Sequence, residues 1–152
     1  MNKKLGFTLV ELMVVVAIIA LLALIAMPKY WHFHARAKRA EVYLNLSALH
    51  TAEKIYWAEN GRYSDKLLGA DSIGWQPDGE PNYTYGFAGA ANVNYILGKL
   101  GKETAVLGNH GQANANGFTA VAIADIDGDG KLDVITINEN HEIKIERDDL
   151  SD

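Results

Sequence analysis

Carboxylates at two places in this chain would each need a cation nearby. The first is a single glutamate, Glu11, inside an apolar stretch that continues to Met27. An ionised glutamate in the hydrocarbon layer of a bilayer costs at least about 2.5–3.5 kcal/mol, so it should acquire a positively charged partner. Residues 12–27 contain no basic side chain. A cut between Gly6 and Phe7 would create an α-amino group four residues from Glu11, close enough on a helix to interact with it.

The same pair of charges could join neighbouring chains. If copies of the helix stack with a stagger, the amine of one Phe7 would meet the Glu11 of the next chain. In a low-dielectric environment this attraction favours association. The position of the carboxylate therefore predicts that several chains assemble through this segment.

The second group is an acidic, Gly-rich stretch, residues 125–133, in which the carboxylates alternate. Its spacing matches the oxygen ligands of a calcium-binding loop. The predicted ligands of a structural Ca²⁺ are four carboxylates and one backbone carbonyl, that of Lys131: Asp125, Asp127, Asp129, Lys131 and Asp133. A complete helix-loop-helix site would end in an acidic bidentate ligand where this chain has Thr136. We therefore expect a calcium-clamped turn between strands, with a metal-free hairpin turn as the alternative.

A long helix should position Glu11. The apolar run over residues 7–27 is 21 residues long, which at 1.5 Å per residue is about 31 Å, enough to span a bilayer. Pro28 should bend the helix without ending it, and helical spacing then continues to a stop signal at Asn60-Gly61. We expect one helix over about residues 7–59. Its second half should turn these side chains toward a core: Leu46, Leu49, Ala52, Ile55 and Tyr56.

The acidic stretch should lie between strands. Residues 118–126 are apolar on both faces, as in a strand covered on both sides, and residues 132–138 form a second strand. Residues 142–146 alternate as a half-buried edge strand. In the preceding turn-rich region, residues 82–87 fit a short strand, while residues 93–100 fit either a helix or a strand. The expected architecture is α+β, a long helix packed on a small antiparallel sheet.

Composition limits the function classes. With 152 residues and a net charge of −5, the chain has room for one anchor helix and one domain, and it lacks the basic surface of a nucleic-acid binder. It has no cysteine for a disulfide, and its five histidines lack zinc-ligand spacing. No nucleophile elbow, phosphate-binding glycine loop or acid–base pair is recognisable. The sequence offers no candidate catalytic residue, and we therefore expect that the protein is not an enzyme.

The string GFTLVELMVVVAIIALLALIAMP resembles the N-terminus of type IV pilins and of the related pseudopilins of type II secretion. The resemblance implies a type IV pilin-like fold, cleavage between Gly6 and Phe7 by a prepilin peptidase, and N-methylation of Phe7. It also implies that Glu11 contacts the N-terminus of the neighbouring subunit in the fibre. The chain would then be a structural subunit that forms a homo-polymer with the help of an inner-membrane pilus assembly machinery. The alternatives are a pseudopilin of a type II secretion system and a membrane-anchored calcium-binding module.

Under this interpretation the chain has five segments. They are a leader peptide (residues 1–6), a transmembrane and fibre-core helix (7–27), its amphipathic continuation (28–59), a connecting region (60–117) and a C-terminal region of strands (118–152). Lys3 and Lys4 predict a cytoplasmic N-terminus, a periplasmic domain in the inner-membrane precursor, and later an extracellular fibre. Losing these lysines with the leader leaves 12 basic and 19 acidic side chains, a net charge of −7. A secretory signal peptide is the alternative, but Leu24-Ile25-Ala26 is a poor cleavage site for one.

Overall fold

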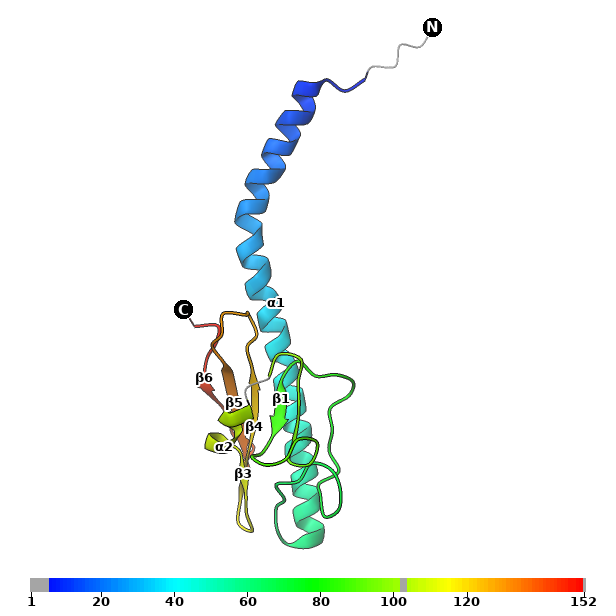
Figure 1. Ribbon diagram of the computed structural model, residues 1–152, viewed down its shortest axis with the longest axis vertical. Coiled ribbons are helices and arrows are strands. Elements are labelled where there is room, and N and C mark those ends of the chain that lie inside the picture. Colours follow the sequence, from blue (N-terminus) through cyan, green and yellow to red (C-terminus); the bar gives the residue numbers. More distant parts are fainter. Residues whose placement is uncertain (1–5, 102–103, 152) are drawn as a thin grey trace. The chain divides into compact units, whose positions relative to one another are not determined.

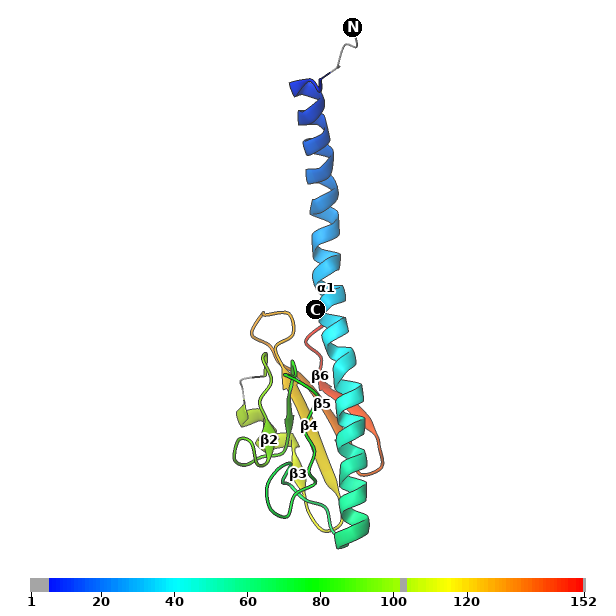
Figure 2. The same cartoon turned by 90° about the vertical axis from the view of Figure 1, so that its right-hand side faces the viewer.

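The computed structural model describes residues 6–101 and 104–151, which form one long helix followed by an antiparallel sheet (Figures 1 and 2). The expected leader falls mostly outside the described residues, as do Lys3 and Lys4. The chain divides into two compact units, Met1–His34 and Ala35–Asp152. The elements are α1 (Leu9–Asn60), β1 (Thr84–Gly86), β2 (Tyr95–Ile96), the 3₁₀-helix η1 (Thr104–Val106), α2 (Leu107–His110), β3 (Gln112–Ala113), β4 (Phe118–Ala124), β5 (Asp133–Asn138) and β6 (Ile143–Arg147).

Helix α1 begins at Leu9, two residues later than expected, because Thr8 caps it. The Thr8 hydroxyl oxygen accepts a hydrogen bond from the Glu11 amide at 3.2 Å, and the Thr8 carbonyl accepts one from the Leu12 amide at 3.2 Å. A threonine followed three residues later by a glutamate is a capping-box sequence. Glu11 therefore lies in the first turn, where a negative charge also interacts favourably with the helix dipole.

The other end of α1 follows its stop signal closely. The helix runs on through position 28 and ends at Asn60. Gly61 then adopts a φ of +70°, and its amide donates to the Trp57 carbonyl at 2.8 Å. Glycine adopts this left-handed conformation without steric cost, which is why helices often end one residue before it.

The sheet lies against the second half of α1, within the unit Ala35–Asp152 (Figure 2). Its strands are ordered β2-β1-β4-β5-β6, with β3 also paired to β4, and each of these strand pairings is antiparallel. This arrangement confirms the expected fold class. β1 lies in the expected range 82–87, and the undecided range 93–100 contains the strand β2. β3 and α2 were not expected, because two to four residues are too short for any periodicity to show.

Strand β4 is covered on both faces, as its sequence predicted. Ala120, Ala122 and Ala124 belong to the core that also contains Leu46 and Leu49 of α1. The alternating residues of β4, Val121 and Ile123, pack in a second cluster with Leu107 of α2 and with Leu132 and Val134. Because side chains alternate along a strand, the small alanines share one face and the β-branched residues the other. The alanines let the helix approach closely, and α2 covers the opposite face.

The face of α1 that packs on the sheet differs from the expectation at one position. Leu46, Leu49 and Tyr56 are buried as expected, but Ile55 is 57% exposed. The inward position is taken by Glu53, because residues 46, 49, 53 and 56 follow the helical repeat. Glu53 is fully buried, and its Oε2 accepts a hydrogen bond from the Ser64 amide at 3.2 Å. Its Oε1 has no hydrogen-bond partner in the part of the chain that the structure describes. Burial raises the pKa of Glu53 to about 7.

Candidate assembly segment and candidate metal centre

The first candidate site is the N-terminal part of α1, where every described side chain from Phe7 to Met27 is exposed. Phe7 itself is 79% exposed and precedes the helix. Removing apolar surface from water contributes about 25 cal/mol of favourable free energy per Å². A segment of this length is therefore unfavourable in water and needs lipid or other chains around it. α1 is long and apolar enough to cross a membrane, and the most apolar window of the helix is not buried within the chain.

Glu11 is the acidic residue of this segment. Residues 12–27 contain no basic side chain that could neutralise its charge. Beside it, Leu12, Met13, Val16, Ala17 and Ala20 line a shallow apolar groove along the helix. Small residues such as the two alanines allow the backbones of packed helices to come close. The segment therefore combines an apolar packing surface with one carboxylate near its beginning.

The second candidate site is the loop that joins β4 to β5, at the same end of the sheet as the C-terminal tail (Figure 1). Asp125, Asp127 and Asp129 of this loop and Asp149 of the tail each place one carboxylate oxygen within 4.8 Å of the others. Oxygen ligands from aspartates at such short separations can hold a divalent cation. Three of the predicted ligands are thus brought together, and a fourth aspartate joins them from a distant part of the sequence.

The loop holds its carboxylates through local hydrogen bonds. Asp125 accepts hydrogen bonds from the amides of Gly128 at 2.7 Å and Gly130 at 3.1 Å. Both glycines have φ near +90°, a conformation that other residues rarely adopt. The Lys131 amide donates to Asp129 at 2.7 Å, and the Lys131 ammonium lies 2.9 Å from the same carboxylate. Lys131, expected to contribute its backbone carbonyl, therefore interacts with the group through its amide and its side chain.

Asp133 does not belong to this group, which differs from the predicted ligand set. As the first residue of β5 it is fully buried and accepts hydrogen bonds from Arg39 Nε at 3.0 Å and Nη2 at 2.6 Å. The Tyr83 hydroxyl donates a further bond to it at 2.6 Å. The two-pronged guanidinium contact and the tyrosine use both carboxylate oxygens. Asp133 is the buried anion of an ion pair with α1.

Asp149 takes the fourth place in the acidic group, and sequence reasoning missed it. The residue is 2% exposed, and its Oδ2 accepts a hydrogen bond from the Ile126 amide at 2.9 Å. Its Oδ1 has no hydrogen-bond partner within the described residues. Burial, together with the three loop carboxylates, raises the pKa of Asp149. The pair Asp148-Asp149 close to the end of the chain was the available signal, but the spacing of a single loop could not connect it to residues 125–129.

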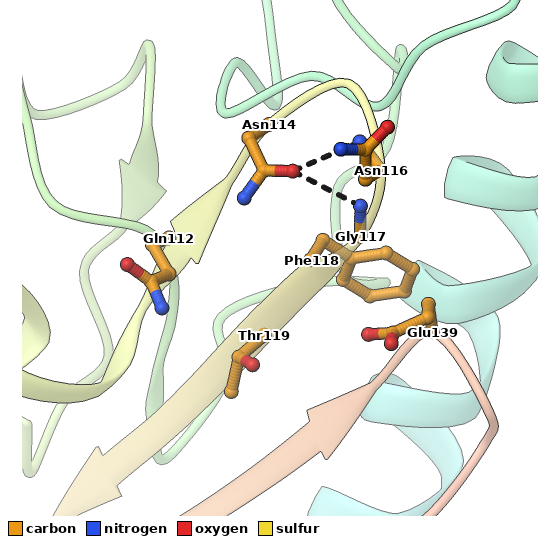
Figure 3. A pocket seen from close by; sticks show the side chains of 7 residues that line it. All are labelled: Gln112, Asn114, Asn116, Gly117, Phe118, Thr119 and Glu139. Carbon is orange, nitrogen blue, oxygen red and sulfur yellow. Dashed lines mark hydrogen bonds between the residues drawn. The ribbon is translucent and has the colours of Figure 1, made fainter.

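A third feature is a shallow polar depression at the turn between β3 and β4 (Figure 3). Figure 3 shows Asn114 accepting hydrogen bonds from the Asn116 and Gly117 amides, at 2.9 and 3.1 Å. Glu139 is the one ionisable residue among the described residues that line it. The Asn114 contacts are those of a tight turn, in which an asparagine side chain replaces a backbone acceptor.

Comparison with known proteins gives the N-terminal segment a family description. Residues 1–27 match the family model of the prokaryotic N-terminal methylation motif. The matched range contains Gly6, Phe7 and Glu11, which are the residues assigned to processing and assembly from the sequence.

Three relatives extend the similarity beyond this motif. The type IV major pilin protein PilA of Myxococcus xanthus (strain DK1622) is 49% identical over 86 residues, which is 57% of this chain and 38% of the relative. A fimbrial protein of Moraxella nonliquefaciens is 36% identical over 68% of this chain and 55% of its own length. The type II secretion system core protein G of Klebsiella pneumoniae is 35% identical over 54% of this chain and 59% of its own length. In each case the similarity spans less than two thirds of the relative.

Proposed function

We propose that this chain is a structural subunit of a type IV pilus. Its N-terminal segment and its fold are similar to those of the type IV pilins and the type II secretion pseudopilins. A prepilin peptidase would cut between Gly6 and Phe7, and Phe7 would be N-methylated. The mature chains would polymerise into an extracellular fibre through the N-terminal part of α1. The observation that carries this proposal is an apolar segment, exposed from Phe7 to Met27 and helical from Leu9, with one carboxylate in the first turn of the helix.

Polymerisation satisfies both unusual features of the segment. Helices packed along the groove at Ala17 and Ala20 would cover apolar side chains that the chain itself leaves exposed. The new α-amino group of Phe7 would supply the cation for Glu11, either in the same chain or in a staggered neighbour. Inside a bundle of apolar helices this attraction is weakly screened, so it would set the register between subunits.

Before assembly, the precursor would be held in the inner membrane. From Leu9 to Met27 the helix is about 29 Å long at 1.5 Å per residue, close to the thickness of a bilayer's hydrocarbon core. Five consecutive ring side chains follow and are all exposed: Tyr30, Trp31, His32, Phe33 and His34. Successive residues turn by about 100° around a helix, so these rings point to every side. Rings on all sides suit the headgroup layer of a membrane better than a protein partner, which would cover one side.

The remaining parts of the proposal concern topology and partners. The N-terminus would lie in the cytoplasm and the C-terminal domain in the periplasm, by the positive charges of Lys3 and Lys4. The partners would be other copies of the chain, the prepilin peptidase and methyltransferase, and an inner-membrane assembly machinery. The similarity to a type II secretion core protein supports a second candidate, a pseudopilin in a short periplasmic filament.

Electron microscopy of filaments sheared from the surface of the producing cells would separate the two candidates. With gold-labelled antibodies against this chain, we expect long surface fibres that are labelled along their length. Cells that lack the gene serve as the control and should show no labelled fibre. Labelling confined to the cell envelope, with none in the sheared material, would refute the pilus proposal and favour the secretion filament.

A further inference from the structure

We propose that Asp125, Asp127 and Asp129 of the β4–β5 loop and Asp149 of the C-terminal tail together bind one calcium ion, which fastens the tail to the loop. The proposal concerns the folded domain and does not depend on whether the chain forms a fibre. It differs from the site expected from sequence spacing, because the last carboxylate comes from the tail and not from Asp133.

The four carboxylates converge from two separate segments. Each contributes an oxygen within 4.8 Å of the others, although Asp149 belongs to a different part of the chain from the loop. Ca²⁺ binds oxygen ligands at about 2.3–2.6 Å, so ligand oxygens around one ion lie within about 5 Å of one another. Asp127 and Asp129 are exposed and Asp125 is half-buried, which leaves the loop side open for water ligands and for entry of the ion.

An independent observation at Asp149 points to a ligand. Asp149 is only 2% exposed, yet its Oδ1 has no hydrogen-bond partner among the described residues. Leaving a buried polar atom unsatisfied costs about 1–3 kcal/mol, and more for a charged group. The other oxygen, Oδ2, accepts the Ile126 amide at 2.9 Å and so fixes the carboxylate in place. A cation among the four carboxylates would satisfy the remaining oxygen and offset their mutual repulsion.

The chemistry of the donors selects calcium among the common metal ions. All four side chains offer carboxylate oxygens, which suit hard cations, and no cysteine or histidine belongs to the group. Mg²⁺ requires near-ideal octahedral geometry and gives up its waters reluctantly, whereas Ca²⁺ accepts irregular sets of six to eight oxygens. Ligands that come partly from a turn and partly from a tail form an irregular set, which fits the less demanding ion.

The ion would connect three parts of the domain. On the tail, the residue before Asp149 is Asp148, which is ion-paired with Arg39 of α1. The Asp149 amide donates to the buried Asp133 at 3.3 Å, and Lys38 of α1 donates to the Ile126 carbonyl at 2.8 Å. A calcium ion at Asp149 would therefore hold the loop, the tail and the helix together, in a chain that has no cysteine to form a disulfide.

The test uses the full chain in detergent micelles, stripped of metal with a chelator and then titrated with calcium. Thermal unfolding followed by near-ultraviolet circular dichroism, and calorimetric titration, report the stabilisation and the affinity. We expect the unfolding temperature to rise with calcium until the site saturates, and magnesium at the same concentration to have a smaller effect. Asp149→Asn should weaken calcium binding by about tenfold or more, because it removes one charged ligand.

Asp148→Asn is the matched control, since it changes the neighbouring residue and removes a contact to Arg39 outside the acidic group. It should lower the unfolding temperature by similar amounts with calcium and with chelator, and leave the calcium affinity close to that of the unaltered chain. With chelator, Asp149→Asn should unfold at or above the temperature of the unaltered chain, because a buried anion has been removed. The proposal is overturned if calcium has no effect on the unaltered chain, if Asp149→Asn binds calcium as tightly, or if Asp148→Asn loses as much affinity.

Discussion

Glu11→Gln should sharply reduce the yield of fibres while the precursor still inserts into the membrane. Glutamine has nearly the same shape and can occupy the same place in a capping box with Thr8, so the start of α1 should be preserved. What is lost is the negative charge that would pair with the amine of Phe7. An uncharged side chain also crosses the bilayer at lower cost, so insertion should be unchanged or improved. The measurement compares sheared fibres and membrane-bound chain by quantitative immunoblotting.

Glu59→Gln provides the matched control, because Glu59 is an exposed glutamate at the other end of the same helix. That variant should assemble normally. If Glu11→Gln cells make as many fibres as Glu59→Gln cells, charge pairing does not drive assembly. A loss of membrane-bound chain in Glu11→Gln would instead place the defect before assembly, which is also against the account.

Arg39→Met should destabilise the folded domain by about 3–5 kcal/mol, the cost of removing one partner from a buried ion pair. Asp133 is fully buried and Arg39 is 12% exposed, so the carboxylate left behind would be shielded from water. Tyr83 would remain as a donor but cannot neutralise the charge. Urea unfolding of the full chain in micelles, followed by near-ultraviolet circular dichroism, measures the free energy of unfolding.

Two further variants show whether the buried charge is the cause. Arg39→Met combined with Asp133→Asn should recover much of the lost stability, because asparagine keeps an acceptor for Tyr83 without the charge. Arg62→Met should change stability by only about 0–1 kcal/mol, since its ion pair with Asp71 is about half exposed on both sides. A double variant no more stable than Arg39→Met alone would show that lost packing, and not the stranded charge, causes the effect.

The sequence was sufficient for the long elements because their signals extend over many residues. The apolar run and the helical repeat defined α1 to within two residues at each end, and the two-sided apolar pattern of β4 predicted that both of its faces are covered. Short elements such as β3 and α2 carry no periodic signal and form because β4 and its apolar face offer partners. Ile55 was placed inward because it is apolar, whereas the helical repeat assigns that face to the polar Glu53.

The acidic group shows a different limit. Spacing along one loop correctly indicated that Asp125, Asp127 and Asp129 lie together. It could not show that Asp133, as the first residue of β5, is buried against Arg39, because that contact is made by residues 94 positions apart. For the same reason it could not bring in Asp149, whose position depends on how the tail returns to the sheet. Local geometry is encoded by neighbouring residues, whereas the membership of a site depends on the complete fold.

The intact mass and N-terminal sequence of the chain, purified from the cells that produce it, test the central claim most directly. The account predicts a mature chain that begins at Phe7 and carries one methyl group on its α-amine. This end would create the amine that is proposed to pair with Glu11. A chain that keeps Met1, or one that begins after Ala26, would contradict the account, since α1 would then have neither the new amine nor a role in fibre assembly.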